Sequence, residues 1–403
     1  MTHQRMCRVF SGRNKGFFCA VNYLILIVGI LLLLAGCEEV QQLLAPVPAE
    51  DDDGTIKIGF IYTSNTRSNS LNGAELAALQ LNGGGGAHGR EIEIIARGNI
   101  SDTEQAAVIT EELIIQERVS AIVGPNRSNY AVVIGPVAQR YGIPMVTTTA
   151  TNPSVTAAGD FVFMAAFTDD FQGKVMATFA TQDLEAKTAA VLTRRESLYS
   201  EGLSQTFIDN FTALGGEVVH AQFYMRGDTD FTAQLTAIAE AAPDVFFLPG
   251  FSAEIPLVVQ QAKTLGITGI LLGGDSWDNA VLISENSEIL EGSFFSSLFS
   301  ADAAPGDLSE DADQFITAYT SIFQVPPAGG AALGYDGVRL VVQAMRRADD
   351  LTPTAIRDQL AATMDYSGAT FISGYDENRH PNKSAVINQI VNGEARFYKL
   401  IEP

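Results

Sequence analysis

Short apolar runs alternate with helical patterns along the chain from residue 55 onward, and this alternation constrains the fold more than any other feature. Residues 56–63 and 119–124 have the apolar character of buried strands, whereas 71–82 and 129–141 repeat their apolar residues at helical spacing. Repeated strand–helix–strand units indicate parallel sheets with helices on both faces. A single sheet of about a dozen strands is unusually wide. We therefore expect an α/β fold built as two doubly wound lobes.

The rest of the chain extends this pattern and then departs from it. Further strands are predicted at 91–97, 144–149, 161–167, 188–193, 217–224, 245–249, 270–273 and 292–299, and a helix at 102–117. Three helices in succession are predicted at 309–323, 331–347 and 354–364. Residues 384–399 are predicted to form two strands joined at Asn392-Gly393. Both of these turn residues tolerate the positive φ angles of a tight hairpin turn.

The N-terminal segment has the features of an exported lipoprotein. It is basic and continues into a 13-residue apolar run, which suits a signal peptide and is short for a membrane span of about 20 residues. The run ends in Leu34-Ala35-Gly36-Cys37, which resembles the lipobox of bacterial lipoproteins. We expect residues 1–36 to be a cleaved signal peptide, Cys37 to carry the lipid anchor, and residues 37–54 to form an acidic tether. The alternative is an uncleaved membrane anchor.

Charge and cysteine content exclude several functions for the body of the chain. Four of the 25 basic residues and none of the 47 acidic residues lie within 1–37, so the remainder carries 21 basic against 47 acidic residues, a net charge of −26. Such a surface repels nucleic acid. Cys7, Cys19 and Cys37 are the only cysteines, so the body holds no disulfide and no cysteine nucleophile.

Motifs for cofactor, metal or hydrolase chemistry receive no support from their context. The stretch 84–89 satisfies GxGxxG, but it follows a predicted helix and precedes a predicted strand, the reverse of the dinucleotide-binding order. The four histidines are isolated, and the sequence has no Walker motif and no GxSxG elbow. We expect no metal and no cofactor.

Polar side chains gather where the predicted strands end, which is where open parallel sheets bind ligands. Ser128 follows one strand and opens a helix, so its hydroxyl is placed to seat an anion, to cap the helix, or both. A hydroxyl-rich stretch, 147–151, ends the next strand. Tyr199, Phe251 and Asp275 follow three later strands, and the only tryptophan, Trp277, comes two residues after Asp275. Together they predict a pocket with an anion seat, an acid and aromatic walls.

Several segments in their order and spacing resemble the type 1 periplasmic-binding-protein superfamily, specifically its branched-chain amino-acid-binding group. They are Asn72-Gly73-Ala74-Glu75-Leu76-Ala77, Ile122-Val123-Gly124-Pro125 with Ser128, Gly142-Ile143-Pro144, Thr149-Ala150-Thr151, Tyr199-Ser200-Glu201-Gly202, Gly273-Gly274-Asp275, and the stretch from Ser367-Gly368 to Tyr375-Asp376-Glu377-Asn378. The resemblance implies two lobes joined by three crossovers around a ligand cleft. It implies lobe 1 from 55–168 and 299–366, and lobe 2 from 169–298 and the C-terminal strands 367–403.

The resemblance also implies a role for each matching residue. Ser128 and Thr151 would hold the α-carboxylate of an amino acid. The carbonyl of Thr149 would accept from the α-ammonium, with Asp275 as the counter-charge. Tyr199 and Phe251 would cover the ligand from the second lobe, and closure of the cleft would follow from tighter binding to the closed form.

The sequence departs from the group's pattern at three places. The first loop, 63–71, lacks its usual aromatic residue and carries Arg67, which we interpret as solvated, the alternative being a contact to a polar ligand side chain. Phe251 stands where a tyrosine is common. The late turn has Arg379-His380-Pro381 where glycine is frequent.

These features predict a lipid-anchored extracytoplasmic protein that captures an amino acid or a similar small polar solute. The resemblance implies delivery to the permease and ATPase subunits of an ABC importer. The alternative is a sensory module of the same fold that signals to a membrane partner. An enzyme is disfavoured because no nucleophile–base pair is visible.

Overall fold

A computed structural model describes residues 54–63, 69–98, 100, 102–304 and 306–403. The predicted signal peptide, Cys37, Arg67 and all of the tether except Gly54 lie outside these residues. The described residues all belong to one compact unit. In the described part of the chain, we find no helix with both the length and the hydrophobicity needed to cross a membrane.

The first lobe is built on a five-stranded parallel sheet in the order β2-β1-β3-β4-β5. Its strands are β1 (Ile56–Ile61), β2 (Ile92–Arg97), β3 (Ala121–Val123), β4 (Met145–Thr147) and β5 (Val162–Met164). Alternate side chains enter different cores: Ile58 and Val146 belong to one cluster, Ile122 and Met145 to another. Both faces are therefore buried, as the apolar strand patterns predicted.

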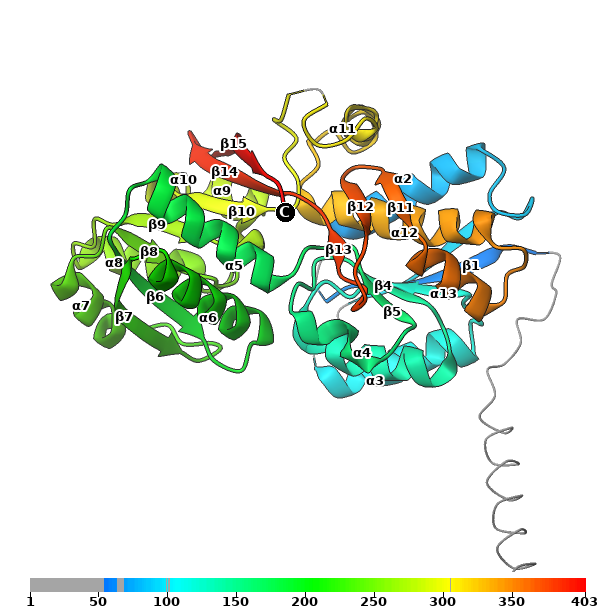
Figure 1. The fold of residues 1–403 in the computed structure, drawn as a ribbon, viewed down its shortest axis with the longest axis horizontal. Coiled ribbons are helices and arrows are strands. Elements are labelled where there is room, and N and C mark those ends of the chain that lie inside the picture. The colour runs from blue at the N-terminus through cyan, green and yellow to red at the C-terminus, as the bar shows by residue number, and fades with distance from the viewer. Residues whose placement is uncertain (1–53, 64–68, 99, 101, 305) are drawn as a thin grey trace, which may run out of the picture. The chain divides into compact units, whose positions relative to one another are not determined.

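Helices cover the two faces of this sheet. One face carries α3 (Thr103–Ile115), α4 (Ser128–Tyr141) and the 3₁₀ turn η1 (Pro153–Ala158). The other carries α2 (Asn69–Gly83) and α12 (Gly329–Arg347), with α11 (Ala312–Phe323) and α13 (Pro353–Ala361) alongside. Helices α2 and α12 lie side by side in both ribbon views (Figure 1). They approach closely because Gly73 lacks a Cβ, which would lie 2.0 Å from the Ala331 carbonyl oxygen.

The second lobe is built on a seven-stranded sheet in the order β15-β14-β10-β9-β8-β6-β7. Its strands are β6 (Thr188–Arg194), β7 (Glu217–Tyr224), β8 (Val245–Phe247), β9 (Ile270–Gly273), β10 (Phe294–Ser297), β14 (Ala385–Val391) and β15 (Glu394–Ile401). Strands β6 to β10 are parallel, and β14 and β15 are antiparallel. The predicted hairpin is confirmed, because Asn392 and Gly393 join β14 to β15 with φ values of 54° and 76°.

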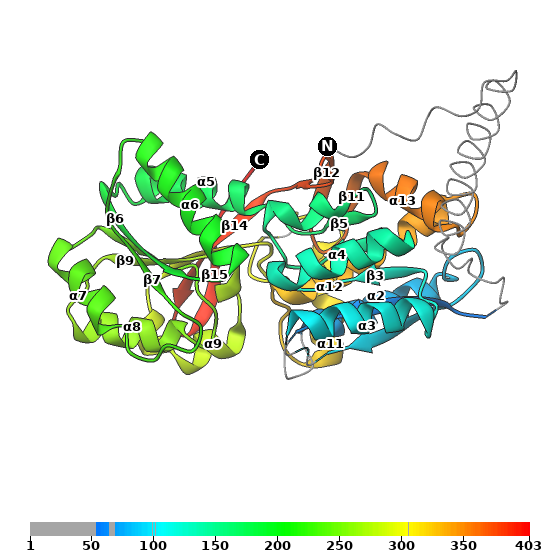
Figure 2. The same ribbon diagram turned by 90° about the horizontal axis from the view of Figure 1, so that it is seen from below.

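Helices also cover both faces of this second sheet. Figure 2 shows α5 (Asp169–Thr178) and α6 (Leu198–Ala213) on one face, and α7 (Thr232–Ala241), α8 (Ile255–Thr264) and α9 (Ala280–Glu285) on the other. The short elements η2 (Phe179–Asp183), η3 (Asp275–Trp277) and α10 (Ser287–Leu290) complete the lobe. Phe247 of β8 packs with the α5–α6 side and Phe246 with the α7–α8 side. The fold class, α/β with two doubly wound lobes, agrees with the sequence prediction.

The structure corrects the predicted start of the C-terminal part of lobe 2. Strands β11 (Met364–Ser367), β12 (Phe371–Tyr375) and β13 (Pro381–Asn382) form a separate three-stranded sheet that the sequence did not predict. The buried carboxylate of Asp336 on α12 accepts hydrogen bonds from Tyr366 Oη (2.7 Å), Ala369 N (2.8 Å) and Thr370 N (2.9 Å). These bonds hold the small sheet on lobe 1, so only β14 and β15 of the segment 367–403 belong to the sheet of lobe 2.

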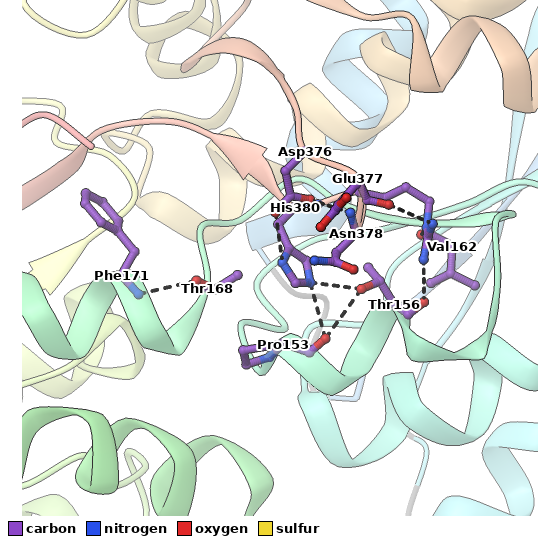
Figure 3. A network of polar contacts seen from close by, with 10 residues as sticks. Pro153, Thr156, Val162, Thr168, Phe171, Asp376, Glu377, Asn378 and His380 are labelled. Carbon is purple, nitrogen blue, oxygen red and sulfur yellow. Dashed lines mark hydrogen bonds and ion pairs between the residues drawn. The ribbon is translucent and has the colours of Figure 1, made fainter. Parts of the chain in front are cut away.

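The late turn at 376–380 is a structural part of lobe 1. The His380 ring Nε2 lies 2.9 Å from Thr156 Oγ1 and 3.3 Å from the Pro153 carbonyl oxygen, so it packs on η1 (Figure 3). Arg379 donates to the carbonyl oxygens of Val162 and Thr156. Arg379 and His380, which stand where glycine is frequent, therefore attach the small sheet to lobe 1. Neither residue lines the cavity between the lobes that is described below.

Candidate binding site

A cavity of about 1060 Å³ lies at the carboxyl ends of the strands of both sheets. In each lobe the parallel strands run in the order 2-1-3-4-5, with the change of direction between β1 and β3 and between β6 and β8. Ligands bind at such switch points because neighbouring loops diverge there. The predicted residues that line the cavity are Ser128 and Thr149 from lobe 1, and Tyr199, Phe251 and Asp275 from lobe 2.

Hydrogen bonds between three strand ends fix the lobe 1 wall. Asn126 Oδ1 accepts from the backbone N and the hydroxyl of Thr63, at 3.1 and 2.9 Å. The Thr149 hydroxyl donates to the carbonyl oxygen of Asn126 at 3.1 Å. Ser128 is the first residue of α4, and its hydroxyl accepts from Asn152 N at 3.2 Å instead of capping the helix. The wall thus presents polar groups at the N-terminus of α4, where the helix dipole favours an anion.

Thr151 differs from its predicted position. It is fully buried and does not line the cavity. Its carbonyl oxygen accepts from Asp169 N at 2.8 Å, which ties the loop after β4 to the start of α5. Of the predicted binding residues, it is the one that the structure does not bring to the cavity.

Asp275 is held by the turn that follows β9. Its Oδ1 accepts from Gln172 Nε2 of α5 at 2.9 Å. Burial raises the pKa of Asp275 to about 6, against the opposite effect of the hydrogen bond from Gln172. A ligand ammonium beside this carboxyl would restore its charged form.

Trp277 anchors the Asp275 turn from inside the core. Its indole N donates to the Leu248 carbonyl oxygen at 2.9 Å, and its side chain is fully buried among the residues of the α7–α8 side. The tryptophan is therefore not an aromatic wall of the pocket, as its place in the sequence suggested, but a support for the loop that carries Asp275.

Two aromatic side chains form the lobe 2 wall. The rings of Tyr199 and Phe251 lie 5.5 Å apart, and the Tyr199 hydroxyl donates to Ser276 Oγ at 3.1 Å. Ser276 in turn donates to the Gly250 carbonyl oxygen at 2.5 Å. Burial holds the pKa of Tyr199 well above its usual range, so the phenol stays neutral and remains a hydrogen-bond donor.

The two lobes contact each other directly at the edge of the cavity. Asn129 at the start of α4 donates to the Glu196 carbonyl oxygen at 2.8 Å and accepts from Leu198 N at 2.9 Å. Asn152 donates to the Leu198 carbonyl oxygen at 2.8 Å. Both asparagines therefore bridge from lobe 1 to the segment that opens α6.

Asp278 and Asp169, two acidic residues close to Asp275, were not among the predicted binding residues. Asp278 lines the cavity, and its Oδ2 accepts from Ser297 Oγ (2.6 Å) and Gly329 N (2.8 Å). Asp169 is fully buried beside Asn152, and burial, together with the nearby charge of Asp275, holds its pKa well above the usual range. The sequence could have indicated Asp278, because it follows the same strand, β9, as Asp275. No feature of the sequence pattern singled out Asp169 as a residue of the site.

The predicted binding residues also did not include the arginines that line the cavity. Arg127, Arg194, Arg195 and Arg226 all line the cavity. Within the described ranges, no group of three or more His, Cys, Asp and Glu side chains is arranged to hold a metal ion. The site is therefore a polar interlobe cavity with hydroxyl, acidic and guanidinium groups, suited to reversible binding of a small polar molecule.

The fold and the site define a two-lobed α/β binding protein. A family model described as periplasmic binding protein matches residues 55–395. The chain belongs to this family of solute-binding proteins, and is accordingly a binding protein and not an enzyme.

Two solved structures and one sequence relative support the assignment. A leucine-binding protein from Thermotoga maritima is 35% identical, with a TM-score of 0.81 over 87% of this chain and 99% of that one. A branched-chain amino acid transporter substrate-binding protein from Streptococcus pneumoniae, in complex with isoleucine, is 31% identical, with a TM-score of 0.80 over 87% of this chain and 100% of that one. A Leu/Ile/Val-binding protein homologue from Brucella melitensis is 26% identical over 70% of this chain and 75% of that protein.

Proposed function

We propose that the protein captures an α-amino acid in the interlobe cavity and delivers it to the permease and ATPase subunits of an ABC importer. The observation that carries this proposal is the pairing of an anion seat with an acid across one cavity. Ser128 at the start of α4 would hold the α-carboxylate, and Asp275 would pair with the α-ammonium. Similarity to proteins described as binding leucine and isoleucine supports the amino-acid class.

The remaining predicted residues take supporting roles in this proposal. The Thr149 carbonyl oxygen would accept from the ammonium, while Tyr199 and Phe251 would cover the ligand from lobe 2. Thr151 would act through its neighbours, because it does not line the cavity. Contacts made by both lobes would favour the closed arrangement in which Asn129 bridges to Glu196 and Leu198.

We propose that the mature protein is extracytoplasmic and anchored by lipid at Cys37, as the sequence before that residue predicts. Expression of the full chain with labelled fatty acid should label the wild type. A Cys37→Ser variant should lose the label and be released from membranes. Label retained in that variant would contradict the anchor without affecting the binding proposal.

Titration of the full chain in mild detergent against the twenty amino acids tests the binding proposal. We expect heat of binding and a raised unfolding midpoint with at least one amino acid. A complete lack of response would refute it. Loss of high-affinity uptake on deletion of the gene would support transport, whereas unchanged uptake would favour the sensory alternative.

A further inference from the structure

The cavity is lined largely by charged and polar side chains, although several relatives are described as binding aliphatic amino acids. Four of the 21 basic residues of the acidic body line it: Arg127, Arg194, Arg195 and Arg226. An aliphatic ligand side chain gains affinity from apolar walls, and it would remove water from charged groups without replacing their hydrogen bonds. The lining therefore favours a ligand with a charged side chain.

The charged surroundings of Arg127 differ from those of Asp275. The groups with the largest electrostatic effect on Arg127 are Arg194, Tyr130, Arg226 and Glu254. Two of the four groups that act on Arg127 are therefore arginines, and the acid among them, Glu254, is already paired with Arg194. The charged group that acts most on Asp275 is a second carboxylate, Asp278. A ligand that pairs with both Arg127 and Asp275 carries an anionic group near Arg127 and a cationic group near Asp275.

Arg127 is the basic group in this cavity that is best placed to receive an anion. Its guanidinium carbon lies 4.7 Å from the centroid of the Phe251 ring, and that of Arg194 lies 4.8 Å from the same centroid. Arg194 already has a counter-charge, because its Nη1 lies 3.3 Å from Glu254 Oε1. Within the described ranges, the Arg127 side chain has no hydrogen bond or ion pair. Burial and the Arg194 charge lower the pKa of Arg127, which a bound anion would reverse.

We infer that the ligand is an amino acid with a carboxylate on its side chain, and that Arg127 binds this second carboxylate. The inference rests on the proposed function, which assigns the α-carboxylate to Ser128 and the α-ammonium to Asp275. The planar guanidinium stacked on Phe251 presents paired N–H donors to the side-chain carboxylate. Arg194, fixed by Glu254, adds positive charge beside it.

Calorimetric titration of the full chain in mild detergent tests the ligand class directly. The probes are glutamate and aspartate, their uncharged analogues glutamine and asparagine, and leucine and isoleucine. We expect one acid to bind at least tenfold more tightly than its matching amide, with the ratio falling as salt rises. Equal or tighter binding of leucine or isoleucine would overturn the inference and leave the proposed function intact. Failure of every amino acid to bind would instead refute the proposed function.

Substitution of Arg127 tests the residue. Arg127→Met keeps an apolar stem for Phe251 and removes the charge, so it should weaken binding of the acid on the order of ten- to hundredfold and of the amide less than about threefold. Equal loss for acid and amide would mean that Arg127 serves the α-carboxylate, which would overturn the inference.

Two further variants make this test secure. The matched control Arg140→Met lies in the last turn of the same helix, exposed and paired with Glu111, and should bind like the wild type. If Arg127→Met does not fold, Arg127→Lys keeps the charge but not the paired donors, and should weaken binding of the acid more than that of the amide. The acid-to-amide ratio of the wild type decides the ligand class without any variant.

Discussion

Asp275 is the single side chain on which ligand affinity should depend most. Its carboxyl is held by Gln172 and backed by the buried Trp277 turn, so it is positioned before any ligand arrives. Asp275→Asn keeps the size of the side chain and removes the charge that the ammonium needs. We expect a loss of roughly 3–5 kcal/mol in binding free energy, measured by calorimetry with the amino acid that binds the wild type. Asp313→Asn, on the exposed side of α11, is the control, and equal affinities of the two variants would remove Asp275 from this role.

The pKa of the same carboxyl predicts how affinity changes with pH. Because burial raises the pKa of Asp275 to about 6, the ligand-free protein is protonated there at lower pH. Binding of an ammonium then requires loss of that proton. Affinity should be constant above about pH 7 and fall by up to tenfold for each pH unit below about pH 6. Calorimetry across this range should show the fall in the wild type and not in Asp275→Asn, and a flat wild-type profile would contradict the assignment.

The stability of the ligand-free protein should depend on this group in the opposite direction. A folded-state pKa raised above the unfolded value means that the neutral acid favours the folded state. The contribution of Asp275 to stability is fully present below the unfolded pKa, near 4, and is lost as pH rises through about 6. The site therefore binds best under conditions in which its own acid stabilises the fold least.

At the scale of elements, the crossing of α2 and α12 depends on glycine. A Cβ at Gly73 would lie 2.0 Å from the Ala331 carbonyl oxygen and 3.0 Å from Tyr335 N, and neither backbone atom can move without shifting α12. We expect Gly73→Ala to lower the free energy of unfolding by about 1–3 kcal/mol or more, measured by urea denaturation. Gly83→Ala at the end of α2 is the matched control, because nothing lies within 4 Å of its added Cβ. Equal stability of the two variants would show that the helices do not pack this closely.

At the scale of the whole molecule, the two lobes should unfold together. One cluster of buried residues runs from Phe60 and Val338 in lobe 1 to Phe207 and Phe247 in lobe 2. Trp277, the only tryptophan, reports on lobe 2 alone because it is buried there. We expect its fluorescence and the far-UV circular dichroism of the whole chain to show coincident transitions in urea. Two separated transitions would mean that the lobes are independent folding units.

The sequence predicted the elements well where local pattern determines them. Strand β7 and the Asn392-Gly393 hairpin were predicted at their observed positions, because alternation and turn chemistry act over a few residues. The small sheet of β11, β12 and β13 was missed. It exists because Asp336, some thirty residues earlier in the chain, accepts its backbone and side-chain donors, and no local pattern encodes that partnership.

The sequence by itself determined that this chain is an α/β binding protein with polar strand ends, because parallel strands place those ends along one edge and the residue types there are fixed. Tertiary structure decided which polar residues face the cavity. It turned Thr151 and Trp277 into the core, and it brought Arg127 and Arg194 to one phenyl ring from different lobes. Burial and charge depend on neighbours that are distant in sequence. The raised pKa of Asp275, and the lack of a hydrogen bond or ion pair to the Arg127 side chain among the described residues, therefore became visible only when the lobes were assembled.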